Sequence, residues 1–376
     1  MSLQTQTVLA DSLLRHQNKD GGWGFSPSKA SWLEPTFYAM LALDGAPQHA
    51  NALDRAWAKV RSWQLPEGGC RPTDAVDQPN WTTALWIQLH CRRKVFDDRF
   101  VKSLFWLSQA RGEEGRLWLR LLSRMKNSPD HYGWSWFPGS HSWIEPTAHS
   151  LLAMQISLRE SESLPTLLTN TLKERIAMGQ QMLLDRRCSD GGWNYGSGSA
   201  FNVPLPSYPE TTAVALLGLQ QANAAGRKAA CSKAAGLYRA TQSPLALAWL
   251  QLALRVHGEA VAPPPDLPPG PTELMLVSLR MLGAEDGNFR LLACQSAKDA
   301  GRDAKLARNT PATAAAGSSV LRTFFKSGVP AYAGQYSGGT FLWKAAPALR
   351  CLRLCERGCF QRLVRAFFKS PKGAKT

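Results

Sequence analysis

Residues 20–43 read DGGWGFSPSKASWLEPTFYAMLAL, and this stretch decides the fold. It begins with a glycine pair and a tryptophan, and it ends in the apolar run FYAMLAL. Glycine adopts left-handed backbone conformations at little cost, so we expect Gly21 and Gly22 to cap the end of a preceding helix. Pro35 is expected in the first turn of the next helix, where a proline loses no hydrogen bond.

The same pattern occurs four times, at residues 20–43, 67–89, 132–154 and 190–219. Repetition at tens of residues is typical of folds built from stacked helix pairs. The copies align without gaps from a threonine onward, and these threonines are Thr36, Thr82, Thr147 and Thr212. Two residues before them stand Glu34, Asn80, Glu145 and Glu210.

Each apolar run is followed by a segment with apolar residues at helical spacing, as in residues 53–63. The unit is therefore a buried helix and an amphipathic helix, and no strand signal is present. The pattern decays after residue 240, where residues 271–279 predict a fifth buried helix and residues 311–325 and 343–368 predict further helices. We expect an all-α fold of ten to twelve helices in five or six pairs, closed into a ring because a helix that is apolar all round needs cover on both faces.

The composition indicates a globular chain of 376 residues, 44% of them hydrophobic. No apolar run is long enough to span a bilayer, and residues 1–16 predict a helix rather than a secretory leader. The eight cysteines lack the paired spacing of a zinc or redox site, so we expect free thiols in the cytoplasm and neither a metal nor another cofactor.

The net charge is +16, and residues 344–376 hold nine Lys and Arg residues but one Glu. The segment has apolar residues near one stripe, so it predicts either a basic amphipathic helix on the anionic inner face of the membrane or a final helix with a solvated tail. Nucleic-acid binding is disfavoured, because no known binding module accompanies the charge.

Residues 17–24, QNKDGGWG, resemble the QW repeat of the squalene and hopene cyclases. That family and the β subunits of protein prenyltransferases form α/α toroids. The resemblance covers four repeats, about residues 5–225, although the second copy has Cys70 in place of the tryptophan. It implies an α/α toroid over residues 1–343 and a closing helix with a basic tail over residues 344–376.

Class II terpenoid cyclases protonate an alkene or epoxide with the middle aspartate of an Asp-x-Asp-Asp-Thr motif, which this chain lacks. The alignment places glutamates at the position of that acid, and the catalytic candidates are Glu34, Glu145 and Glu210. Protonation of an alkene needs a neutral carboxyl, whereas a helix N-terminus favours the charged form. The alternative is that each glutamate stabilises its helix as a cap.

Aromatic side chains gather near the predicted starts of the buried helices, where a toroid would open. The residues expected to bind substrate are Trp32, Phe37, Tyr38, Asp74, Asp77, Trp81, Trp136, Trp143 and His149. The tryptophans could instead stack on neighbouring repeats, and His149 could be a hydrogen-bonded core residue. The zinc site of a protein prenyltransferase is not expected, since Cys188 and Asp190 stand in the reverse order on a turn.

Two functions remain open on this basis. The first is an enzyme of squalene cyclase type, an intramolecular transferase or isomerase that cyclises or isomerises an isoprenoid by acid chemistry. The second is a toroid without catalytic activity that binds an isoprenoid, another hydrophobic ligand or a partner peptide. The missing aspartates favour the second, and the aromatic residues and retained glutamates favour the first.

Overall fold

The computed structural model describes residues 3–114, 131–200, 203–267 and 273–294, and all of them belong to one unit of the chain. These residues form eleven α-helices, which confirms the all-α prediction. A short hairpin, formed by β1 (Ser199–Ala200) and β2 (Val203–Pro204), was not predicted. The segments 311–325, 343–368 and 344–376 lie outside the described residues.

Six helices, here called the inner helices, are buried on nearly every side. They are α2 (Leu33–Leu43), α4 (Thr83–Arg93), α7 (Ile144–Glu160), α9 (Pro209–Gly218), α11 (Pro244–Val256) and α12 (Leu274–Leu282). In α2 every residue except Glu34 is buried, because the helix has neighbours on both sides. Residues 244–256 were not predicted as a buried helix, and so α12 is the sixth inner helix rather than the fifth.

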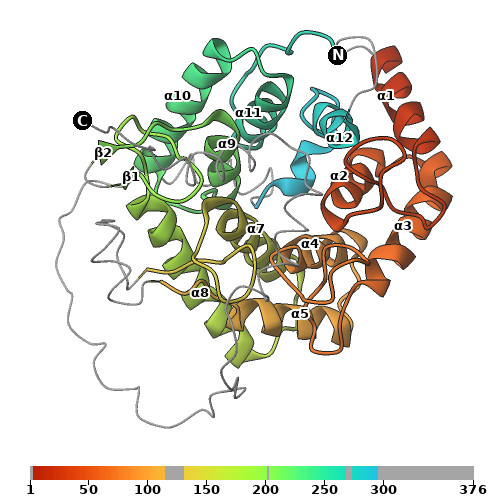
Figure 1. Cartoon of the computed structure of the whole chain (residues 1–376), viewed down its shortest axis with the longest axis horizontal. Coiled ribbons are helices and arrows are strands. Elements are labelled where there is room, and N and C mark those ends of the chain that lie inside the picture. Colours follow the sequence, from red (N-terminus) through yellow and green to blue (C-terminus); the bar gives the residue numbers. More distant parts are fainter. Residues whose placement is uncertain (1–2, 115–130, 201–202, 268–272, 295–376) are drawn as a thin grey trace, which may run out of the picture. The chain divides into compact units, whose positions relative to one another are not determined.

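The other five helices, here called the outer helices, are amphipathic and lie around the inner ones (Figure 1). They are α1 (Leu3–Arg15), α3 (Ala50–Ser62), α5 (Asp98–Gln109), α8 (Thr166–Asp185) and α10 (Ala224–Ala240). In α3 only Ala52, Leu53, Ala56 and Val60 are buried, which agrees with the predicted apolar face. Short 3₁₀ helices, η1 (Pro47–His49) and η2 (Asn288–Leu292), complete the helical structure of the described residues.

The inner helices contact one another in chain order, and α12 also contacts α2. We call the residue after each glycine pair, such as Trp23, Cys70 or Trp193, the turn residue. A recurring backbone hydrogen bond joins the start of an inner helix to the loop residue two positions after the turn residue of another repeat. These bonds run from the N–H of Leu33 to Pro72 (2.8 Å), of Ile144 to Tyr195 (3.0 Å) and of Leu274 to Phe25 (2.9 Å). The third bond joins α12, the last inner helix of the described unit, to the first repeat.

The repeated threonines fasten the turns to the inner helices. The threonine Oγ1 accepts a hydrogen bond from the backbone N–H of the turn tryptophan, in the pairs Thr36 with Trp23 (2.9 Å), Thr147 with Trp134 (3.0 Å) and Thr212 with Trp193 (3.0 Å). The indole N–H of each tryptophan in turn donates to the preceding outer helix, at Leu13, Leu107 and Leu183. The turn tryptophans therefore hold the two layers together.

The second repeat is shifted by one residue from the alignment made on sequence. Thr83, rather than Thr82, accepts the bond from the turn residue, with Cys70 N–H at 2.8 Å. Asn80 N–H bonds to Cys70 O at 3.1 Å, just as Trp32 N–H bonds to Trp23 O at 3.0 Å. Asn80 is thus the counterpart of Trp32, and its alignment with Glu34 is wrong.

The glycine turns differ in part from the prediction. Gly21 has the expected positive φ of 93°, but α1 ends at Arg15, so the glycine lies within the turn and does not cap the helix. A Cβ atom there would lie 2.6 Å from the carbonyl oxygen of Arg55, and no side chain fits. Pro35 lies in the first turn of α2, as predicted.

Candidate functional site

Tyr38 of α2 and His149 of α7 meet inside the described unit. The Tyr38 hydroxyl lies 3.3 Å from His149 Nε2, and both side chains are buried. His149 Nδ1 is also buried and has no hydrogen-bond partner among the described residues. Burial lowers the pKa of His149 to about 3, so the imidazole is neutral at physiological pH.

Two tryptophans pack on this pair, and a third packs on one of them. The Trp81 ring lies 5.3 Å from that of His149 and 5.2 Å from that of Trp136, and the Trp249 ring lies 5.4 Å from that of Tyr38 at an angle of 90°. These separations fall within the range of favourable aromatic contacts. We call these five side chains the aromatic cluster: Tyr38, Trp81, Trp136, His149 and Trp249.

Trp249 was not identified from the sequence. It belongs to α11, whose sequence PLALAWLQLALRV lacks the glycine turn that marks the first four repeats. The available signal was a mostly apolar stretch of thirteen residues, with Pro244 in its first turn and Ser243 before it as N-cap.

Two of the three candidate glutamates lie near the aromatic cluster. Glu34 and Glu145 are half-buried in the first turns of α2 and α7. Burial, and then the negative charges of Glu34 and Glu145, raise the pKa of Tyr38 well above its ordinary value. The charges of both carboxylates therefore act on the Tyr38 hydroxyl. Glu210 is half-buried in the first turn of α9, and it does not contribute to this shift.

The N-cap positions of these helices are aromatic rather than acidic. Trp32, Trp143 and Tyr208 precede α2, α7 and α9, and none makes a side-chain capping hydrogen bond. Each glutamate follows its N-cap by two residues. The glutamates therefore lie near, but not at, the N-cap, where negative charge interacts favourably with the helix dipole. Their role in stabilising the helix starts stays a prediction.

The remaining predicted residues do not join the aromatic cluster, except that Phe37 packs against Tyr38 with ring centroids 4.9 Å apart. Trp32 packs on Phe25, and Trp143 lies against Gly196. Asp74 accepts a hydrogen bond from the indole N–H of Trp63 at 2.8 Å.

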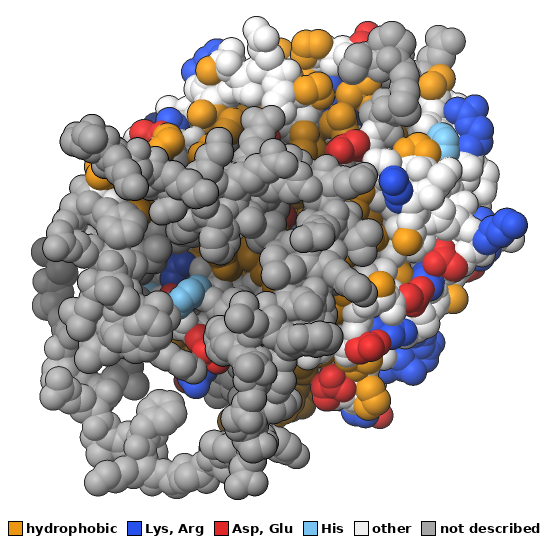
Figure 2. Space-filling model, viewed as in Figure 1, with side chains coloured by type: hydrophobic (Ala, Val, Ile, Leu, Met, Phe, Trp, Pro, Cys, Tyr) orange, Lys and Arg blue, Asp and Glu red, His pale blue; other side chains and the backbone are white. Residues whose placement is uncertain are grey.

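Asp74 and Asp77 lie among charged partners at the surface. Lys59 Nζ lies 2.6 Å from Asp74 and 3.1 Å from Asp20, and Arg71 lies 3.5 Å from Asp77. Asp20 and Asp74 also line a surface hollow of about 390 Å³. Figure 2 shows Lys and Arg side chains beside Asp and Glu side chains along one margin of the visible face. The two predicted aspartates thus serve surface ion pairs.

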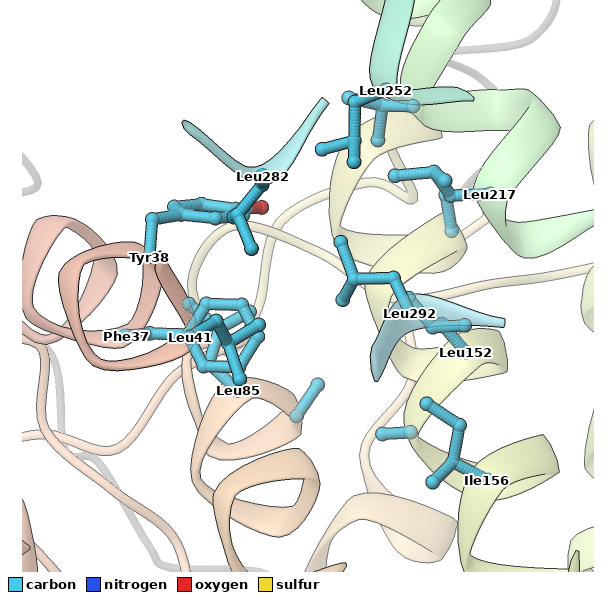
Figure 3. Packing of buried hydrophobic residues seen from close by; sticks show 14 of the residues in the cluster. Phe37, Tyr38, Leu41, Leu85, Leu152, Ile156, Leu217, Leu252, Leu282 and Leu292 are labelled. Atoms are coloured by element: carbon cyan, nitrogen blue, oxygen red, sulfur yellow. The ribbon is translucent and has the colours of Figure 1, made fainter. Parts of the chain in front are cut away.

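The space between the inner helices is filled by apolar side chains. Figure 3 shows Phe37, Leu41, Leu85, Leu152 and Leu217 turned into this interior from different helices. They belong to one buried cluster, and Leu292 of η2, which is 1% exposed, belongs to it as well. The segment after α12 therefore contributes a side chain to this apolar interior.

No group of three or more His, Cys, Asp or Glu residues within the described ranges could hold a metal ion. Cys70, Cys91, Cys188, Cys231 and Cys294 are buried free thiols. Among the same residues, no helix is both long and apolar enough to cross a bilayer.

No protein-family model matches the chain. A 65-residue segment, 17% of the chain, is 43% identical to the drimenyl diphosphate synthase of Streptantibioticus cattleyicolor, and it spans 12% of that protein's length. Among solved structures, the type II terpene cyclase MstE from Scytonema has a TM-score of 0.44 and 17% identity, over 68% of this chain and 74% of that one. The endoglucanase Cel10 from Klebsiella pneumoniae has a TM-score of 0.46 and 14% identity, over 74% of this chain and 97% of that one.

Proposed function

We propose that this chain is an α/α toroid of the terpene cyclase type, and that it cyclises or isomerises an isoprenoid bound at the aromatic cluster. The observation that carries the proposal is the position of Tyr38, which lies near Glu34 and Glu145 on two helices. Tyr38 packs against Trp249 and meets His149, and Trp81 packs on His149. The cyclic contacts of the inner helices support the toroid, and the segment similar to drimenyl diphosphate synthase supports the isoprenoid.

In this proposal Glu34 or Glu145 acts as the acid in its protonated form. Its carboxyl transfers a proton to one carbon of an alkene, the π electrons form the new C–H bond, and the adjacent carbon becomes cationic. The faces of Trp81, Trp136 and Trp249 attract such a cation through their ring quadrupoles. Transfer of a proton from a carbon next to the cation back to the glutamate carboxylate then forms the product alkene, as the C–H electrons become the new π bond, and regenerates the acid.

His149 suits this environment because it is neutral. A protonated imidazole beside Tyr38 would repel a cation, but the low pKa of His149 keeps the ring uncharged. The side chain therefore contributes a polar group to the aromatic cluster without adding positive charge.

The alternative is a toroid that binds the isoprenoid without chemistry. The observation in its favour is the interior filled by leucine and aromatic side chains, together with the missing aspartate motif. In that case the glutamates act only on helix stability.

Incubation with squalene or prenyl diphosphates, followed by mass spectrometry of extracted products, distinguishes the two. Glu34→Gln and Glu145→Gln are the test variants, and Glu210→Gln is the matched control on a third inner helix. We expect the variant of the acid to lose about 10²-fold or more in turnover, as is typical when a general acid is removed. Turnover that is unchanged in all three variants would exclude the acid role, and a co-purified isoprenoid without turnover would favour the binding protein.

A further inference from the structure

Residues 288–294, here called the plug, follow α12 and enter the ring of inner helices. Figure 1 shows this segment in cyan, between the inner helices. Its contacts lie at the last turns of these helices: Asn288 donates to the carbonyl oxygens of Leu41 (3.1 Å) and Asp44 (2.8 Å) at the end of α2. The plug therefore closes the end of the ring that is opposite the glutamates.

Gln220, just after α9, holds the plug with both ends of its amide. Its Nε2 donates to Leu292 O at 2.8 Å, and its Oε1 accepts from Cys294 N–H at 2.7 Å. From α7, Gln155 Oε1 accepts from the Cys294 thiol at 3.0 Å, and Arg159 donates to Ala293 O. Most of these bonds reach the backbone of the plug, and water can replace them when the segment withdraws.

The side chain that the plug inserts is apolar. Leu292 lies in the buried cluster with Leu152 and Leu217, and it lines a small hollow of about 80 Å³ with Leu41 and Ile156. Leu41 is three residues after Tyr38 on α2, about 4.5 Å along the helix axis. Leu41, which lines this hollow together with Leu292, thus lies about one helical turn from Tyr38 of the aromatic cluster.

We propose that the plug is an internal competitor: Leu292 occupies the space that the apolar chain of a ligand would take, and the ligand binds fully only when the plug withdraws. The inference rests on the proposed isoprenoid ligand. Polar bonds hold the plug in place around Leu292, while Phe289 and Leu291 are only partly buried against the cluster, so breaking the bonds of Gln220 favours the open form.

The test compares Gln220→Leu with Gln181→Leu, a control at an exposed glutamine of α8. In the Gln220 variant the closed plug leaves Leu292 O and Cys294 N–H without these partners, whereas the open form can hydrate them. We expect the population of the open form to rise about tenfold. Asn288→Ala breaks the bonds at α2 from a half-buried position, and it serves where the Gln220 variant does not fold.

The first readout is alkylation of Cys294 by iodoacetamide, followed by peptide mass spectrometry. Burial raises the pKa of this thiol to about 12, so it reacts only when the plug opens. Alkylation about tenfold faster than in the Gln181 control supports the plug, and an unchanged rate overturns it. The second readout is binding of radiolabelled squalene and geranylgeranyl diphosphate to the same proteins.

We expect Gln220→Leu to bind one of these isoprenoids about tenfold more tightly than the wild-type chain. Faster alkylation with unchanged isoprenoid affinity would overturn the competition. Faster alkylation without isoprenoid binding by either protein would instead refute the proposed ligand, since an open ring would then reject it.

Discussion

Replacing Thr83 by valine tests the one-residue shift of the second repeat. Valine keeps the shape of threonine but removes the oxygen that accepts the Cys70 N–H at 2.8 Å. Both residues are buried, so this N–H loses its partner without gaining water. A buried donor left without an acceptor costs about 1–3 kcal/mol.

Thr82→Val is the matched control. The Thr82 hydroxyl donates to Asn80 Oδ1 at 2.8 Å, and that oxygen also accepts from the Thr82 backbone N–H at 2.9 Å. No acceptor is left empty in this variant, and we expect a cost under about 1 kcal/mol. The gapless sequence alignment makes the opposite prediction, because it places Thr82 at the position of Thr36, whose Oγ1 accepts the bond from the turn residue.

Thermal unfolding followed by circular dichroism measures the difference. For a chain of this size a loss of 1–3 kcal/mol corresponds to a fall in Tm of roughly 1–4 °C, which is expected for Thr83→Val and also for Thr36→Val. A larger fall for Thr82→Val than for Thr83→Val would refute the shifted register.

Three further predictions concern other parts of the unit. Gly68→Ala should lower the free energy of unfolding by more than about 2 kcal/mol, because φ is 103° and a Cβ would lie 2.4 Å from a carbonyl oxygen of α5. The control Gly45→Ala, with φ of 90° and open space around the Cβ position, should lower it by about 1 kcal/mol, and urea denaturation measures both. Glu114→Gln should cost about 3 kcal/mol, because it leaves the buried Arg186 without its carboxylate at 2.7 Å, and a Glu114→Leu, Arg186→Met double variant should recover most of the loss. His149 has a pKa of about 3 when folded and about 6.5 when unfolded, so between these pH values the unfolded chain binds one more proton than the folded chain. The free energy of unfolding therefore falls on acidification, by up to about 1.4 kcal/mol per pH unit. His149→Gln should flatten that dependence in denaturation curves at about pH 6.5 and about pH 4.

The sequence predicts the helix pairs and the positions of the inner helices well where the repeat is complete. Apolar runs behind a glycine turn leave few alternatives to a buried helix, and α2 is buried as expected. The contact between Tyr38 and His149 was harder to predict from the sequence, because the two residues are 111 positions apart and meet only through the packing of their helices. Both residues were candidates for the same site, but their contact was not predicted.

Two features escaped prediction for identifiable physical reasons. The shift at Thr83 arises because the chain enters α4 through Thr83 N–H to Asn80 O, a tighter turn than the Thr36 N–H to Trp32 O bond at the start of α2. Adjacent threonines conceal this difference in the sequence. The plug is a short polar-to-apolar segment without periodicity, and its partners, among them Gln155 and Gln220, reach it only through the tertiary fold.

The bond from Leu274 N–H to Phe25 O has a consequence for the time course of folding. It joins residues roughly 250 positions apart, and contacts of such separation form slowly because a long loop must close first. At ribosomal rates of 5–20 residues per second, α2 is synthesised about 12–50 s before α12 can cover its open side. The first repeat therefore emerges with apolar surface that its last neighbour cannot yet protect, and the nascent chain is a candidate for chaperone binding during that interval.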